Sequence, residues 1–334
     1  MTGRLARWLW SLAWRPGADR GARLVIVRHH RVYRDDESPL YRIGVSAAVL
    51  ERQLEVLAGA GLNPVTVTEG LEWLAVARTG RRVAMTFDDG YADNVHTALP
   101  LLVARGARAS FFLTAGLMEE RRAPWWDVLA HALERTAVAR LEGFEGLPEP
   151  LALADRADRA RVLGALLPLL RVAPERQHAL LEALRDRLAV RETPPCALAT
   201  WEEARALVEA GMEVGAHTLT HPYLSTCDRE RQRAEIAGSR ARVAERLGIE
   251  PAGFAYPGGD HDAVSLEEVE RAGFRWAVAT RRGDNLPGAP RFELRRRGLS
   301  DGACLSPRGR FSRRLALAEL HGAFDRMRGV ESPA

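Results

Sequence analysis

The sequence predicts an α/β fold in which strands alternate with helices around a mostly parallel sheet or barrel. Short apolar runs rich in β-branched and aromatic residues recur along the chain, at 24–27, 64–67, 83–87, 109–113, 213–216, 253–256 and 276–279. Segments with helical spacing of their apolar residues separate these runs. Polar residues follow several of the runs directly, where the loops of such a fold carry functional groups.

The helices are expected between the strands. The first begins near Val45, places Leu50, Leu54 and Leu57 on one side, and stops at Gly61. Further helical segments are expected after Gly90 and at 201–210, 229–247 and 266–272. Between 119 and 195 the signals for strands vanish, and Leu, Ala, Arg and Glu recur at helical spacing, which indicates a helical insertion.

These patterns divide the chain into segments. Residues 1–22 form an N-terminal segment rich in Trp and Arg, and 23–302 form the main domain, interrupted by the insertion at 119–195. Residues 303–334 should form a C-terminal helix and a tail that is loose over 331–334.

The N-terminal segment is a poor signal peptide because its apolar run is short and interrupted. It interleaves two residue types, namely Arg4, Arg7 and Arg15 with Trp8, Trp10 and Trp14. Two interpretations remain open: a helix packed on the domain, or an amphipathic helix in peripheral contact with an anionic membrane surface. Without an export signal, we expect a cytoplasmic protein, either free or associated with the inner membrane face.

Composition excludes several classes of function. All 48 basic residues are Arg, so Schiff-base catalysis and P-loop nucleotide hydrolysis, which need a Lys, are excluded. The formal net charge of +4 does not indicate a nucleic-acid partner. The cysteines are three, far apart and without a C-x-x-C pair, which favours a reducing compartment.

Two motifs at strand ends carry candidate metal ligands. Asp88 and Asp89 end one strand, and because successive side chains of a strand point to opposite sides, one can bind a metal while the other stays free. His217 and His221 follow another strand and can converge on one ion. Two imidazoles and one carboxylate leave coordination positions open, as in catalytic zinc or iron sites.

These residues, in this order, resemble those of the polysaccharide deacetylase family of carbohydrate esterases (family 4), whose members share a NodB homology domain. Thr86-Phe87-Asp88-Asp89-Gly90 and His217-Thr218-x-x-His221 match its first two motifs, and 255–260 are similar to its third. His30-Arg31-Val32 is similar to the Tyr-His-Arg-Val start of a bacterial subgroup.

The resemblance implies an incomplete (β/α)7 barrel and a hydrolase that removes N-acetyl groups from an amino-sugar polysaccharide or glycoconjugate. By it, Asp89, His217 and His221 bind a divalent metal, most plausibly zinc, and Asp88 is the general base toward a metal-activated water. The backbone N–H of Tyr91 would stabilise the oxyanion. The substrate would be bound by residues of the third motif, namely Tyr256, Pro257 and Gly258.

The chain departs from the family pattern in two places. The third motif begins with Ala255 where the family has an Arg that pairs with the base, and Arg296 is the candidate replacement. The family's late Leu-x-His motif, which supplies the general acid, has no counterpart, so His261 and His30 are the candidates for that role. Near the start of the insertion, Trp125-Trp126 could form a sugar-stacking platform or anchor the insertion to the barrel.

Two other functions remain possible from the sequence. One is a metal-dependent amidohydrolase acting on a non-sugar amide, because the same site would serve it. The other is a sugar-binding pseudoenzyme, which the two departures favour and the intact Asp88 opposes.

Overall fold

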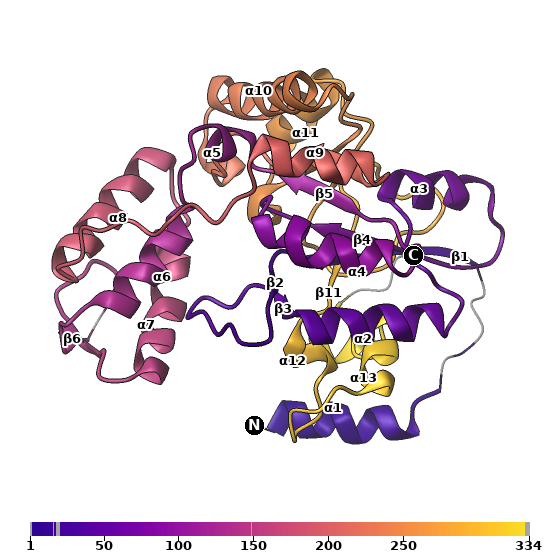
Figure 1. The fold of residues 1–334 in the computed structure, drawn as a ribbon, viewed down its shortest axis with the longest axis horizontal. Helices are drawn as coiled ribbons and strands as arrows, with labels where there is room; N and C mark the ends of the chain where they lie inside the picture. Colours follow the sequence, from indigo (N-terminus) through magenta and orange to yellow (C-terminus); the bar gives the residue numbers. More distant parts are fainter. Residues whose placement is uncertain (1, 16, 18–20, 148, 331–334) are drawn as a thin grey trace.

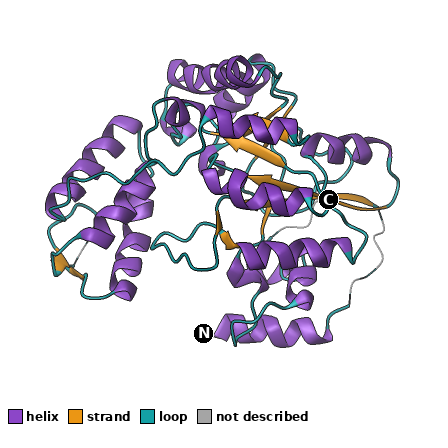
Figure 2. Ribbon diagram, in the orientation of Figure 1, coloured by secondary structure: helices purple, strands orange, loops and turns teal. Residues whose placement is uncertain are grey.

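The computed structural model describes residues 2–15, 17, 21–147 and 149–330 of the 334-residue chain. The tail 331–334, which we expected to be loose, lies outside the described residues. The architecture is α/β, with a curled parallel sheet that forms an incomplete barrel, as the sequence predicted (Figures 1 and 2).

The main sheet has seven strands in the order β10-β9-β8-β5-β4-β1-β11, and all its neighbours pair in parallel. The strands are β1 (Ala22–His29), β4 (Gly80–Phe87), β5 (Ser110–Leu113), β8 (Glu213–Ala216), β9 (Gly253–Ala255), β10 (Trp276–Val278) and β11 (Arg297–Gly298). Two short pairs lie outside it: parallel β2 (Val32–Tyr33) with β3 (Val45–Ser46), and antiparallel β6 (Arg140–Leu141) with β7 (Leu151–Ala152).

The helices of the barrel cover the convex side of the sheet and one end of its interior. They are α2 (Ala47–Ala58), α3 (Val67–Val76), α4 (Leu99–Val103), α5 (Ala115–Glu119), α9 (Trp201–Glu209), α10 (Arg229–Leu247) and α11 (Ala263–Arg271). A π-helical turn (Asn94–Ala98) precedes α4. The chain ends in α12 (Asp301–Cys304), α13 (Arg313–Leu320) and a 3-10 turn (Arg326–Arg328).

Alternation along the strands gives the sheet two apolar faces. Val25 and Val27 of β1 belong to the large cluster shared with α2, α4, α9 and α10, which is the helix-covered side. Leu24 and Ile26 belong to a second cluster with residues of β4, β5, β9 and β10, which is the concave interior. Residues of α3 complete that cluster, so α3 closes the interior near the amino ends of the strands.

The gap between the two edge strands is partly closed by an extended segment, 291–298. Its Leu294 exchanges backbone hydrogen bonds with Ala277 and Ala279 beside β10, and a few residues later β11 pairs with β1. This segment therefore crosses from one edge of the barrel to the other.

The segment between α5 and α9 contains α6 (Trp125–Arg135), α7 (Arg156–Leu169) and α8 (Pro174–Arg187), together with the β6–β7 pair that its composition did not indicate. These helices lie beside the barrel (Figure 1). They have an apolar core of their own, built mainly from Leu side chains of all three helices.

One predicted strand, at 64–67, is wrong. Only Val65 makes a bridge, to Ala84, and Val67 already begins α3. The physical reason is a capping box, in which the Thr66 hydroxyl accepts from the Glu69 amide and the Glu69 carboxylate accepts from the Thr66 amide.

The N-terminal helix α1 (Thr2–Ala13) packs against α13. Arg7 donates to Glu319 at 2.8 Å, and the Trp10 and Phe324 rings lie 5.3 Å apart. Across the described residues, no helix is both long and apolar enough to span a membrane.

Candidate active site

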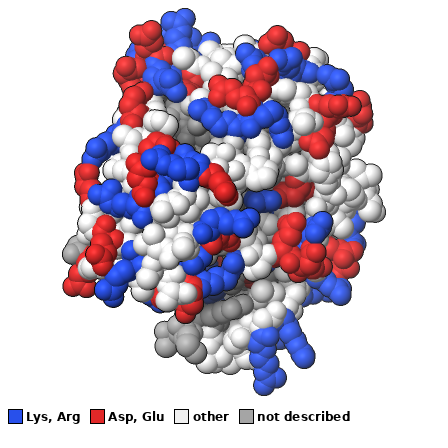
Figure 3. Space-filling model, turned by 60° about the vertical axis from the view of Figure 1, so that its left-hand side comes forward, with Lys and Arg blue, Asp and Glu red and all other residues white. Residues whose placement is uncertain are grey.

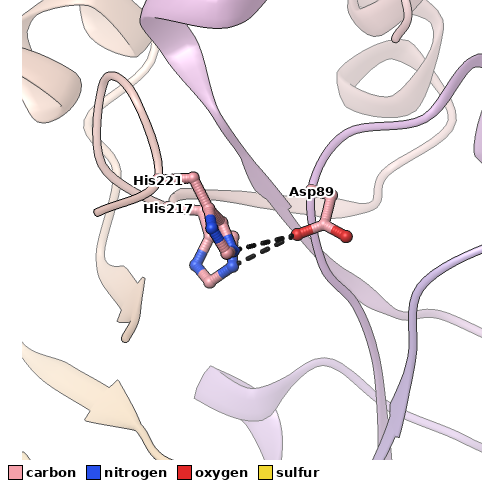
Figure 4. A group of neighbouring side chains, drawn as sticks. All are labelled: Asp89, His217 and His221. Atoms are coloured by element: carbon pink, nitrogen blue, oxygen red, sulfur yellow. Dashed lines mark ion pairs between the residues drawn. The ribbon is translucent and has the colours of Figure 1, made fainter. Parts of the chain in front are cut away.

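The two motifs converge at the carboxyl ends of β4 and β8. Asp89, His217 and His221 are buried and offer ligand atoms that all lie within 4.8 Å of one another. Figure 4 shows both imidazoles facing the Asp89 carboxylate. Asp89 Oδ1 lies 3.4 Å from His217 Nε2 and 3.5 Å from His221 Nε2.

An unusual backbone brings these ligands together. Asp89, Thr218 and His221 all have positive φ, at 75°, 65° and 61°, a conformation that costs free energy for a residue other than glycine and that is concentrated at functional sites. The carboxylate of Glu235, from α10, accepts the amides of Leu219 and Thr220 at 2.8 Å and thereby holds the histidine loop.

The surrounding hydrogen bonds leave the ligand lone pairs free. His217 Nδ1 lies 2.7 Å from the carbonyl oxygen of Ala255, and because a carbonyl only accepts, Nδ1 is the donor; in the neutral tautomer that this bond selects, the lone pair is on Nε2, which faces Asp89. Asp89 Oδ1 is buried and makes no hydrogen bond within the described part of the chain. Several electron pairs facing one another without a donor between them fit a bound cation.

Burial and neighbouring charges set the protonation of this group. Burial lowers the pKa of His221 to about 3, so this imidazole is neutral and can act as a ligand near pH 7. Burial also opposes ionisation of Asp89, but its interactions with the nearby histidines outweigh burial and lower the pKa of Asp89.

The second carboxylate, Asp88, continues the inward-facing alternation of β4 and pairs with Arg296. Nη1 of Arg296 donates to Oδ1 at 2.6 Å and Nη2 donates to Oδ2 at 2.8 Å, while Nε donates to the carbonyl of Ala279. Both side chains are almost fully buried. Burial alone would raise the pKa of Asp88, but the Arg296 guanidinium outweighs it and holds that pKa well below its usual range.

The two histidines considered for the acid lie in different surroundings. His30 lines the cavity that opens above Asp88 and Asp89, and its Nε2 lies 3.9 Å from Asp88 Oδ2. His261 is outside the cavity wall: it stacks on Tyr256, and its Nε2 lies 3.3 Å from Glu293. The structure therefore brings His30, but not His261, to the cavity beside Asp88. Burial lowers the pKa of His30.

The backbone N–H of Tyr91 makes no hydrogen bond to the neighbouring segment 197–199. Hydrogen bonds from Ala92 to Ala197 and from Ala199 to Gly90 make Tyr91 and Leu198 a non-hydrogen-bonded antiparallel pair. The Tyr91 N–H consequently points away from Leu198.

The side chain of Tyr91 connects the barrel to α6. Trp126 Nε1 donates to the Tyr91 hydroxyl at 2.7 Å, which in turn donates to Asp127 at 3.1 Å. The Trp126 ring also packs edge-on against His221, with centroids 4.3 Å apart. Trp126 thus anchors the insertion, while Trp125 is less buried and also lines the cavity. Burial raises the pKa of Asp127 to about 6.

Of the third-motif residues, only Gly258 reaches the cavity. Tyr256 is fully buried and packs on Phe254 and His261. Gly258 has φ 61°, and a Cβ there would meet the Tyr223 ring at 2.9 Å, so this position requires glycine.

A cavity of about 750 Å³ opens above the candidate metal ligands and Asp88. One wall comes from the barrel and the loop before β3. The other comes from the insertion, through α6 and the α7 residues Gly164, Leu167 and Pro168. The sequence did not indicate that α7 would contribute to this site, because helical periodicity does not show which face a separate module turns toward its neighbour.

The family model for polysaccharide deacetylases matches residues 75–277. The chain belongs to this family, and it is a hydrolase of carbon–nitrogen bonds other than peptide bonds. No curated protein matches the sequence significantly.

Solved structures share the fold. The deacetylase PplD of Streptococcus pyogenes, in complex with acetate, is 17% identical with a TM-score of 0.58, covering 86% of this chain and 96% of that one. IcaB from Ammonifex degensii is 23% identical with a TM-score of 0.55, covering 84% and 91%. A de-N-acetylase from Aggregatibacter actinomycetemcomitans is 16% identical with a TM-score of 0.52, covering 82% and 94%.

Proposed function

We propose that the protein removes N-acetyl groups from an amino sugar in a polysaccharide or glycoconjugate. In this proposal Asp89, His217 and His221 hold a divalent ion, and zinc is the first candidate. The observation that carries the proposal is the pairing of this ligand cluster with a separate buried carboxylate, Asp88, at the floor of one cavity. A binding module has no need of that second carboxylate.

The ion, when bound, supplies a Lewis acid for the acetyl carbonyl and lowers the pKa of water. Asp88 takes the proton from the attacking water, and Arg296 keeps Asp88 ionised and oriented toward the cavity. The amide of Tyr91 donates to the oxyanion that develops on the carbonyl.

The amine must leave with a proton, and His30 is our candidate for delivering it. It lines the cavity within 3.9 Å of Asp88, so a proton accepted by Asp88 has a short path to it. His261 lies behind Tyr256 and lacks such a path. The acid role of His30 would appear as a loss of turnover in His30→Gln that leaves metal content unchanged.

The main test is acetate release from N-acetylglucosamine oligomers by zinc-loaded protein. Asp88→Asn should retain zinc but lower kcat by about 10²- to 10⁴-fold, since it removes the proton acceptor. The matched control is Asp36→Asn, an exposed carboxylate paired only locally with Arg34. Chelation should abolish release.

Other outcomes have clear meanings. Full activity of zinc-loaded Asp88→Asn would overturn the assignment of the base. Absence of release by wild-type protein with zinc bound would instead favour a non-sugar amide as substrate, or a sugar-binding role without turnover.

We further propose that the protein acts in the cytoplasm, in peripheral contact with a membrane through α1. The support is an apolar stripe on the side of α1 that faces away from α13: Leu5, Leu9 and Leu12 are 49%, 52% and 38% exposed and follow helical spacing. Sedimentation with phosphatidylglycerol vesicles tests this contact.

A further inference from the structure

Arg28 places a guanidinium in the cavity wall beside the catalytic groups. Leu24 and Ile26 of β1 face the barrel interior, and Arg28 is the next residue of that alternation. In the sheet it lies between Thr86 of β4 and Gly298 of β11, at the level where the cavity begins. Thr86 also accepts a hydrogen bond from Arg296, so Arg28 lies next to the ion pair that Arg296 forms with Asp88.

Within the described residues, the side chain of Arg28 makes no hydrogen bond and no ion pair, while its backbone pairs with β4 and β11. The carboxylate of Asp88 is already paired with Arg296, which donates to both of its oxygens. Burial and the charge of Arg296 lower the pKa of Arg28, which means that its cationic form is not well compensated in the free protein. A partly buried charge without a partner is costly, and an anionic ligand would remove that cost.

The other charged residues of the cavity wall add to the positive charge of Arg28. Two further arginines line the cavity: Arg42 pairs with Asp301, whereas Arg171 lies over the Tyr223 ring at 5.1 Å. Among the described residues that line the cavity, the carboxylates are Asp88 and Asp89. The first is neutralised by Arg296 and the second belongs to the metal-ligand cluster. The cavity therefore presents net positive charge to whatever enters it.

We infer that the substrate carries a negative charge, a carboxylate or a phosphate, on or next to the N-acetylated amino sugar, and that Arg28 binds this group. Arg is suited to both because its planar fork donates two parallel hydrogen bonds to either anion. The inference rests on the proposed deacetylase function and specifies its substrate class. It makes Arg28 a determinant of specificity.

The test compares a neutral with two anionic acetylated substrates. Acetate release is measured from N-acetylglucosamine oligomers, from N-acetylglucosamine 1-phosphate and from hyaluronan oligosaccharides, which carry a carboxylate on every second sugar. The readout is the ratio of kcat/KM for each anionic substrate to that for the neutral one. The anionic substrate with the larger ratio identifies the group that is recognised.

Wild-type protein should prefer at least one anionic substrate, and Arg28→Met should lower that preference about 10-fold or more, as for loss of a charge-assisted hydrogen bond. Arg28→Lys retains the charge but not the planar fork, so its preference for the anionic substrate should lie between those of wild type and Arg28→Met. The matched control is Arg52→Met, an exposed residue of α2 that pairs with Glu55. A role of Arg28 in supporting Asp88 alone would lower all three rates together and leave the ratio unchanged, which would overturn the inference.

A second readout does not depend on turnover. Calorimetry compares binding of N-acetylglucosamine 1-phosphate and of N-acetylglucosamine to wild-type and Arg28→Met proteins with equal zinc content and equal melting temperature. About 10-fold weaker binding of the phosphate alone supports the inference, and equal binding by the two proteins overturns it. If no acetate is released from any substrate, the deacetylase proposal fails, and this binding result still decides the role of Arg28.

Discussion

A step of one residue separates two different roles for carboxylates in this site. Asp88 keeps the strand conformation and points into the barrel, where Arg296 covers both of its oxygens. Asp89 adopts φ 75°, which turns its carboxylate toward the two histidines. Gly90 follows at φ 80°, where a side chain would strain the backbone. The motif therefore encodes a strand end that separates the proposed base from a proposed metal ligand.

The pair formed by Asp88 and Arg296 leads to a prediction about activity. Arg296→Met should destabilise the protein by about 3–5 kcal/mol, because it leaves a buried carboxylate uncompensated, and it should lower acetate release by at least about 100-fold. Denaturant unfolding and initial rates, corrected for folded protein, measure the two effects.

The neighbouring residue provides the control. Arg297 is equally buried but turns to the other side of the segment, where it pairs with Asp284 and Asp325. Arg297→Met should also destabilise the protein while preserving activity per folded molecule. Similar activity of the two variants would show that Arg296 is structural only.

At the scale of elements, α6 links the insertion to the candidate metal ligands. Trp126 bonds to the Tyr91 hydroxyl and covers the His221 ring, so the beginning of this helix contacts both motifs. The insertion is thus part of the site's support as well as one wall of its cavity.

Trp126→Ala should weaken zinc binding about 10- to 100-fold, since groups that orient a ligand histidine typically contribute this much. Trp126→Phe keeps a ring against His221 and should lose less, chiefly the hydrogen bond to Tyr91. Competition with a chelating dye measures the dissociation constant. Trp125→Ala, next to it on the cavity wall, is the control and should retain zinc binding. Wild-type zinc affinity in all three variants would exclude a role for Trp126 in orienting His221.

The elements also show what could be predicted from sequence. The strands that carry Asp88 and His217 were predicted because each is an apolar run ending in polar residues, and this is also why the ligand cluster could be identified. β11 was missed because its two residues lie among arginines and give no alternation signal. Arg296 could be selected only by position, since its contact depends on the path of 291–298 across the barrel.

Arg28 shows the same limit more sharply. In the sequence it is one of 48 arginines, next to a histidine pair, and nothing distinguishes it from a solvated residue. Its place depends on the pairing of β1 with β4 and β11, a long-range register that local patterns do not encode.

At the scale of the whole molecule, the two signs of charge are nearly balanced, with 48 Arg against 44 Asp and Glu. On the face in Figure 3, basic and acidic side chains are interspersed. A broad electrostatic attraction to a polyanion is therefore a weaker explanation for membrane contact than local apolar insertion. The exposed stripe on α1 supplies such apolar contact, and on its other side Trp8 and Trp14 pack with Leu315 and Phe324 near α13.

The stripe predicts reversible binding to lipid. Wild-type protein should sediment with vesicles containing phosphatidylglycerol, and Leu5→Gln with Leu9→Gln should lower the bound fraction at least about 10-fold, because each half-exposed leucine contributes about 1 kcal/mol on insertion. Val76→Gln is the control, since Val76 is an isolated exposed apolar residue, 81% exposed, at the end of α3. Equal sedimentation of wild-type and double variant would exclude α1 as the contact, and α1 would then serve only to pack against α13.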